Sequence, residues 1–221
     1  MTGAMPAPGH AVAPTQTLPG VKPPLLFLCH RIPYPPNKGD KIRAFHLLHH
    51  LSQHFDIYLG SFVDDPQDWP WAPEVEKYCR AVYLRPLSAR LATVRSLRGL
   101  LSGQALSIPY YADAGLRKWV EQTVAAHGIR HAMVYSSAMA QFLPDGGQGF
   151  RRKVIDFVDV DSDKWLQYAQ QKPWPQSWVY RREARCLLAL EQTLAEQFDA
   201  GLFVSSAEAD LFHQLSPATA H

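Results

Sequence analysis

Short apolar segments alternate with longer helical segments from Pro24 onward, and this alternation restricts the fold more than any other feature of the sequence. The apolar segments are rich in Val, Ile, Leu, Phe or Tyr, as strands buried on both faces of a parallel sheet usually are. The expected strands are Leu25–Cys29, Asp56–Ser61, Ala81–Leu84, His131–Tyr135, Val154–Val158 and Gly201–Val204. The expected helices are Lys41–Gln53, Ala89–Leu101, Ala112–His127, Ala138–Phe142, Trp178–Phe198 and Ala207–Leu215. This order predicts an α/β fold with a Rossmann-like, doubly wound parallel sheet.

The length of the chain suits one domain. Of its 221 residues, 47% are hydrophobic, which allows a substantial core. Residues 1–24 are rich in Pro, Ala, Gly and Thr and lack the basic start and continuous apolar core of a signal peptide. We expect a disordered leader there, a Rossmann-like domain over 25–215, and a short tail over 216–221.

Charge and hydropathy narrow the range of partners. The 22 basic and 20 acidic residues nearly cancel, so the chain has no overall field that would favour nucleic acid. No apolar stretch approaches the roughly 20 residues that cross a bilayer. The three cysteines are widely spaced and show no metal-ligand pattern. A cytoplasmic protein is therefore expected.

The loop after the first expected strand is the most informative segment. It contains four cationic side chains and a single carboxylate. The cations are Arg31, Lys38, Lys41 and Arg43. Asp40 is the expected N-cap of the following helix, and Gly39 lets a ligand approach the backbone closely. The unpaired N–H groups of a helix N-terminus attract anions, so the loop is a candidate phosphate site. A solvated basic loop before a capped helix is the simpler alternative.

Four histidines crowd the first expected helix and its end. They are His46, His49, His50 and His54. His46 and His50 are neighbours four residues apart and could share a metal ion, but no third ligand can be assigned. We interpret them as exposed side chains of a helix that buries another face. The residues expected on that buried face are Ile42, Phe45, Leu48 and Leu51.

Four segments resemble one protein family. They are HRIPYPPNKGDKIR (30–43), VIDFVDVDSDKW (154–165), YRRE (180–183) and VSSAEADLF (204–212). They resemble family-4-type GT-B glycosyltransferases, most closely the sugar transferases associated with PEP-CTERM and exosortase exopolysaccharide systems. The resemblance runs from about Pro24 to Leu215 in the expected order.

The resemblance implies the N-terminal domain of a two-domain enzyme that transfers a sugar with retention of configuration. In that family the N-domain binds a glycan or lipid-linked acceptor, and the C-domain binds the nucleotide-sugar donor. The glycine of the first loop lies near the donor phosphates, which implies that role for Gly39, with Lys38, Lys41, Arg43 and Arg31 beside it. No cofactor is implied beyond the donor substrate. A complete enzyme of this family is about twice this length, and three alternatives stay open on the sequence: a fragment of a longer protein, a truncated reading frame, or half of a split enzyme whose C-domain acts in trans.

The acidic run Asp156–Asp161 passes from an expected strand toward a helix. Asp159 and Asp161 could orient an acceptor hydroxyl or accept its proton, and we take them as the candidate catalytic residues. They also resemble the D-x-D metal motif of the other glycosyltransferase fold, but GT-B enzymes generally hold no catalytic metal, so none is expected. The structural alternative is that Asp161, Ser162 and Asp163 cap the following helix and match its charge.

Two further segments lie near expected strand ends. Ser136 and Ser137 lack the G-x-S-x-G elbow of a hydrolase, so we expect them to cap the Ala138–Phe142 helix. Residues 85–103 carry four arginines among leucines and suggest contact with lipid phosphates at a membrane surface. Arg90 and Arg98 nevertheless fall within the leucine arc, so the segment is not a clean amphipathic helix.

Two other functions remain open on the sequence. The first is a non-catalytic binding module of the same fold, because one half of a cleft cannot close a donor site. The second is an unrelated doubly wound protein of the flavodoxin or receiver type. It is disfavoured because the first loop offers cations where a receiver needs a carboxylate cluster.

Overall fold

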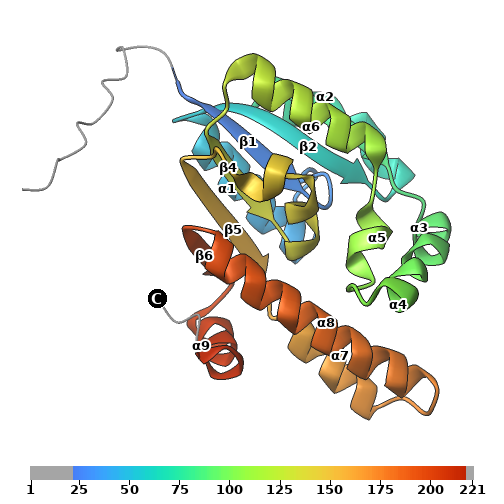
Figure 1. Cartoon of the computed structure of the whole chain (residues 1–221). Coiled ribbons are helices and arrows are strands. Elements are labelled where there is room, and N and C mark those ends of the chain that lie inside the picture. Colours follow the sequence, from blue (N-terminus) through green and yellow to red (C-terminus); the bar gives the residue numbers. More distant parts are fainter. Residues whose placement is uncertain (1–21, 218–221) are drawn as a thin grey trace, which may run out of the picture.

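A six-stranded parallel sheet forms the centre of the structure (Figure 1). The computed structural model describes residues 22–217. The strands are β1 (Pro24–Cys29), β2 (Asp56–Val63), β3 (Ala81–Pro86), β4 (His131–Tyr135), β5 (Arg152–Val158) and β6 (Ala200–Phe203). Their order across the sheet is β3-β2-β1-β4-β5-β6. The prediction of an α/β fold with a Rossmann-like, doubly wound sheet is confirmed.

Helices cover both faces of this sheet. The α-helices are α1 (Gly39–Ser52), α2 (Ala72–Glu76), α3 (Ala89–Ser96), α4 (Arg98–Ser102), α5 (Ser107–Tyr111), α6 (Ala114–His127), α7 (Asp161–Gln170), α8 (Gln176–Gln197) and α9 (Ser206–Leu215). The 3₁₀ segments are η1 (Pro66–Trp71), η2 (Ser137–Phe142) and η3 (Pro144–Gly147). Helices α1 and α2 pack on one face, whereas α6, η2 and α8 pack on the other.

The central strand β1 shows why the sheet needs two layers of helices. Successive side chains of a strand point to opposite faces. Leu26 and Leu28 join the core under α6 and α8, whereas Leu25 and Phe27 join the core under α1 and α2. Both sets are buried, so a continuous apolar run in the sequence became a strand covered on both sides.

Six helices were expected, whereas the described residues form nine α-helices and three 3₁₀ segments. The expected helix Ala89–Leu101 is two helices, α3 and α4. The segment Ala138–Phe142 lies in the 3₁₀ turn η2 rather than in an α-helix. The helix expected after the acidic run, for which no bounds were predicted, is α7. It lies against α8 rather than on the sheet (Figure 1).

The prediction that Asp40 caps α1 is wrong. The N-cap is Lys38, which makes no side-chain cap, and Asp40 lies in the first turn. Its carboxylate is instead bound by the guanidinium of Arg31 at 2.8 Å. The last helix, α9, does have a side-chain cap, because the Ser205 hydroxyl accepts from the Glu208 N–H.

The buried face of α1 also differs from the expected one. Leu48 is buried as expected, but Ile42 is 42% exposed and Lys41 is buried in its place. The ammonium group of Lys41 pairs with the equally buried carboxylate of Asp68 in η1. The ion pair neutralises both charges inside the protein, which is how a lysine can occupy a core position.

Parts of two expected segments lie outside the described residues. Residues 1–21 of the expected leader and 218–221 of the expected tail belong to them. Among the helices between residues 22 and 217, none combines the length and the apolar character that a membrane span requires.

The Lys41–Asp68 pair leads to a stability prediction. Removing one partner leaves a buried charge without compensation, so Lys41→Met and Asp68→Asn should each lower the free energy of unfolding by about 3–5 kcal/mol. Urea unfolding followed by circular dichroism would measure the loss. As a control, Lys77→Met breaks the exposed pair with Glu74 and should change stability little. Equal effects of the buried and exposed substitutions would contradict the prediction.

Candidate functional site

A cavity of about 550 Å³ opens at the carboxyl ends of β1, β4 and β5. Ligands of doubly wound sheets bind at this edge. One wall is formed by α3 and α5, and the opposite wall by α7 and α8. The polar groups of its floor are His30, Asp40, Ser136, Ser137, Asp159, Asp161 and Lys164. Its apolar and aromatic walls include Leu97, Leu106, Tyr110, Tyr111, Phe157, Trp165 and Leu187.

His30, the first residue after β1, lies in the floor of the cavity. Its ring stacks on that of Tyr135 with the centroids 5.8 Å apart, and the Tyr135 hydroxyl donates to the Asp40 carbonyl. The His30 Nε2 is 3.6 Å from the Asp40 Oδ2. Its Nδ1 is buried and has no hydrogen-bond partner among residues 22–217. His30 opens the 30–43 segment that carries the family resemblance, but it was not assigned a role from the sequence.

Asp40 links His30 to the first loop. The contact with His30 and the charge of Arg31 hold the pKa of the Asp40 carboxyl well below its usual range, against the opposing effect of burial. Arg31 binds Asp40 on one side and Asp64, one residue beyond β2, on the other, with contacts of 2.8 Å to each. The guanidinium of Arg31 therefore links the start of α1 to the end of β2.

The cations of the first loop are not gathered at one point. Besides Arg31, Lys41 is buried against Asp68, and Arg43 binds the Asp156 carboxylate at 2.8 Å and the Phe203 carbonyl at 3.0 Å. Lys38 and Gly39 are exposed at the start of α1. A Cβ atom at position 39 would meet no neighbouring atom within 4 Å. The loop therefore leaves only these two predicted phosphate contacts open to solvent.

Both expected catalytic carboxylates line the cavity. The Lys164 ammonium binds the Asp159 carboxylate directly and lies 3.7 Å from Asp161 Oδ1. Burial raises the pKa of Asp161, and the charge of Lys164 opposes this rise. The Asp161 side chain is nevertheless 45% exposed, which limits the effect of burial, and the charge of Asp159 is compensated by Lys164.

Backbone strain occurs at two strand ends that line the cavity. Ser136, after β4, and Val158, at the end of β5, have φ values of 79° and 69°. Such a conformation is unfavourable for a β-branched residue, and strain of about 1–3 kcal/mol is typical of binding and catalytic sites. The buried Asp156 carboxylate accepts from the Val158 N–H at 2.9 Å and helps to hold this turn.

The start of α7 is held by glutamates from two other helices. Glu191 of α8 accepts from the Ser162 hydroxyl at 2.6 Å, and Glu208 of α9 accepts from the Val160 N–H at 2.7 Å. The expected capping by Asp161, Ser162 and Asp163 is therefore wrong, because the acceptors at the start of α7 are the carboxylates of Glu191 and Glu208. The N-cap is Val160 with no side-chain cap, although Asp161 and Asp163 do place negative charge in the first turn.

Arg182 and Glu183, in the YRRE segment, hold the opposite wall. The Glu183 carboxylate is buried and accepts from the Leu106 N–H at 2.8 and 2.9 Å. The Arg182 guanidinium donates to the carbonyls of Gly99 and Gln104. Sequence reasoning assigned neither residue a role. Both side chains bind backbone groups that lie about 80 residues away in the sequence. No pattern among neighbouring residues could have predicted these contacts.

The sequence also singled out Ser136 as a helix cap and the histidines of α1 as candidate metal ligands. Ser136 is the N-cap of η2 but makes no side-chain cap, so the capping prediction is wrong. His46 and His50 are exposed on α1. In the described part of the chain, no group of three His, Cys, Asp or Glu side chains is placed to hold a metal ion.

The arrangement suits a polyhydroxylated or amphipathic ligand. Carboxylates accept hydrogen bonds from hydroxyl groups, and a ring of apolar and aromatic walls with a few convergent polar groups is typical of small-molecule sites. In comparisons with known proteins, no family model matches the sequence and no curated protein matches it. The fold and the cavity define a Rossmann-like α/β protein with a concave site at the carboxyl edge of its sheet.

Glu191 leads to a prediction about pH. Burial raises the pKa of its carboxyl to about 7 from 4.5. Between these values the folded state keeps a proton that the unfolded chain has released, so stability falls as the pH rises from about 4.5 to 7. Glu191→Gln cannot release that proton. Between about pH 5 and pH 8 it should lose less unfolding free energy than the wild type, by on the order of 2 kcal/mol.

Urea unfolding over this pH range would measure the difference. The control is Glu196→Gln, on the same helix but exposed, whose pH profile should follow that of the wild type. A Glu191→Gln profile parallel to the wild-type profile would show that the carboxyl titrates normally.

Proposed function

We propose that the chain is the acceptor-side domain of a GT-B glycosyltransferase, acting in transfer of a sugar from a nucleotide-sugar to a polysaccharide or lipid-linked acceptor. The observation that carries the proposal is the cavity at the carboxyl ends of β1, β4 and β5, into which Asp159 and Asp161 converge with His30. The resemblance of the first loop, the acidic run and YRRE to this family predicted function at these strand ends.

The walls of the cavity support an acceptor sugar as the ligand. Sugars present C–H faces that pack on aromatic rings, and the side chains of Tyr110, Tyr111 and Trp165 line the cavity. Sugar hydroxyls donate hydrogen bonds to carboxylates, and those of Asp159 and Asp161 lie on the floor. In this proposal the acceptor lies between the aromatic walls with one hydroxyl directed at the floor.

The acid–base chemistry falls to the floor residues. Burial raises the pKa of Asp161, which brings it closer to the value useful for proton transfer at neutral pH. In this proposal Asp161 accepts the proton of the acceptor hydroxyl, and Asp159 orients that hydroxyl while bound to Lys164. No cofactor or metal takes part, and the nucleotide-sugar is a substrate.

The donor phosphates are assigned to the start of α1. Gly39 and Lys38 are exposed there, and the unpaired N–H groups of the helix favour an anion. Arg31, Lys41 and Arg43 are each bound to a carboxylate, so in this proposal they hold the loop in place and do not contact the phosphates. The remaining donor contacts would come from a C-terminal domain, in the same chain or in trans.

The test of the proposal is a transfer assay with purified 1–221. The chain is incubated with a panel of nucleotide-sugars and polyprenyl-linked acceptors, first alone and then with a GT-B donor domain as a separate polypeptide. We expect no turnover by 1–221 alone, because catalysis requires donor and acceptor held together, and turnover on mixing. In the active mixture, Gly39→Val should reduce turnover by about tenfold or more by blocking the phosphates.

Gly39→Val is a suitable probe because a Cβ atom at this exposed position would meet no neighbouring atom within 4 Å, so we expect the fold to be retained. Full turnover by 1–221 alone would contradict the half-enzyme interpretation. Acceptor binding without turnover in any mixture would instead favour a non-catalytic binding module of the same fold.

The two aspartates lead to a separate prediction. In the active mixture, Asp159→Asn and Asp161→Asn should each lower kcat by about 10²-fold or more, because proton transfer typically contributes 10²–10⁴-fold. The matched control is Asp163→Asn, in the same helical turn, whose carboxylate binds Gln167. Activity should persist in EDTA. Inhibition by EDTA that Mg²⁺ or Mn²⁺ reverses would contradict the metal-free assignment.

A further inference from the structure

Helices α3 and α4 expose a row of large apolar side chains. The row consists of Leu91, Val94, Leu97 and Leu101, and we call it the α3–α4 patch. Leu91 is 72% exposed and Leu101 is 93% exposed. Scattered exposed leucines are normal, but contiguous apolar patches mark interaction surfaces. Because the helices fold back on α5 and α8, the patch points away from the protein core.

A second apolar surface lies at the turn between α7 and α8. Trp174 is 81% exposed and Trp178 is 54% exposed, and we call the pair the tryptophan turn. The α7–α8 hairpin extends beyond the sheet, and the turn is at its far end (Figure 1). Trp178 lies five residues before Glu183 on α8, a rise of about 7–8 Å along a helix. Solvent-exposed tryptophans at a projecting tip stabilise nothing within the domain.

The two surfaces stand on opposite sides of the cavity. Leu97 of the α3–α4 patch lines one wall, and Trp165 of α7 lines the other. Arg182 of α8 binds the carbonyls of Gly99 and Gln104, so the α4 region is fixed to the hairpin that carries the tryptophan turn. The mouth of the cavity therefore lies between two apolar surfaces held in one rigid arrangement.

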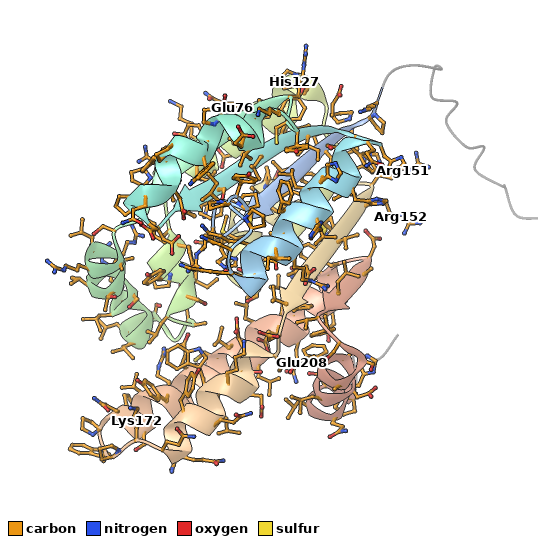
Figure 2. All side chains as sticks on the ribbon, turned by 180° about the vertical axis from the view of Figure 1, so that it is seen from behind. Glu76, His127, Arg151, Arg152, Lys172 and Glu208 are labelled. Atoms are coloured by element: carbon orange, nitrogen blue, oxygen red, sulfur yellow. The ribbon has the colours of Figure 1, made fainter. Side chains whose placement is uncertain are left out.

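The two segments that carry these surfaces contain basic but no acidic residues. Residues 87–112 and 164–182 contain no Asp or Glu. Arg90 and Arg98 are exposed in the first segment, and Lys172 and Arg181 in the second. Figure 2 places Lys172 at the far end of the α7–α8 hairpin, away from Arg151 and Arg152 at the opposite end of the sheet. Exposed leucine and tryptophan beside cations without acids match the interface of an anionic bilayer.

We propose that the α3–α4 patch and the tryptophan turn together dock the protein on an anionic lipid bilayer, with the cavity mouth facing the membrane. Tryptophan rings sit at the headgroup level, leucines reach the acyl boundary, and arginine and lysine side chains bind lipid phosphates. The sequence indicated only residues 85–103; the structure adds a second, distant contact. The proposal does not depend on sugar transfer.

The experiment is vesicle flotation of the full 1–221 chain. The vesicles contain equal phosphatidylglycerol and phosphatidylcholine, or phosphatidylcholine alone. We expect binding to the anionic vesicles that weakens with salt. Leu91→Glu with Leu101→Glu, and separately Trp174→Ser with Trp178→Ser, should each lower the partition coefficient by about tenfold or more. Arg98→Gln with Lys172→Gln should weaken binding to the anionic vesicles by about tenfold.

Matched controls use exposed side chains elsewhere on the protein. Ile42→Glu and Trp71→Ser change residues that are 42% and 41% exposed, and Arg151→Gln with Arg152→Gln removes two exposed cations; all should bind vesicles as the wild type does. Absence of vesicle binding, or equal losses in the controls, would overturn the proposal. Self-association that Leu91→Glu with Leu101→Glu abolishes, without vesicle binding, would assign the surface to a second copy and also overturn it.

Discussion

Two buried glutamates of α8 hold the walls of the cavity. Glu183 binds the backbone at the start of α5, and Glu191 binds the start of α7. A carboxylate inside a protein is stable only where donors surround it, and a helix start is stable only where its free N–H groups find acceptors. Each glutamate satisfies both needs at once. Helix α8 therefore determines where the two walls stand, and the sheet determines the floor between them.

The strands of the sheet could be predicted because the pattern that specifies each strand lies within a few consecutive residues. Each strand is a short apolar run flanked by polar residues, and β4 was predicted residue for residue. The bounds of α7 were not predicted. Its main packing partner is another helix, α8, rather than the sheet, so the pattern of strands does not indicate where it begins and ends.

The position of the site in the fold could be predicted from the sequence, but the contacts of its residues could not. The loops after β1 and β5 do meet at the cavity, as parallel strands require. The contacts of the loop cations depend on residues that are distant in the sequence. Lys41 binds a carboxylate 27 residues away, and Arg43 binds one 113 residues away. Nothing near these cations in the sequence distinguishes an internal ion pair from a phosphate contact. His30 and Glu183 were missed for the same reason.

The hydrogen bond from the Val160 N–H to Glu208 joins the cavity to the last helix. Val160 lies between Asp159 and Asp161, and Glu208 belongs to the first turn of α9. In Figure 2, Glu208 lies where α9 meets the base of the α7–α8 hairpin. The turn that carries both floor carboxylates is therefore anchored by a residue of the last helix, so the backbone between Asp159 and Asp161 is held in place by a segment 48 residues further along the chain.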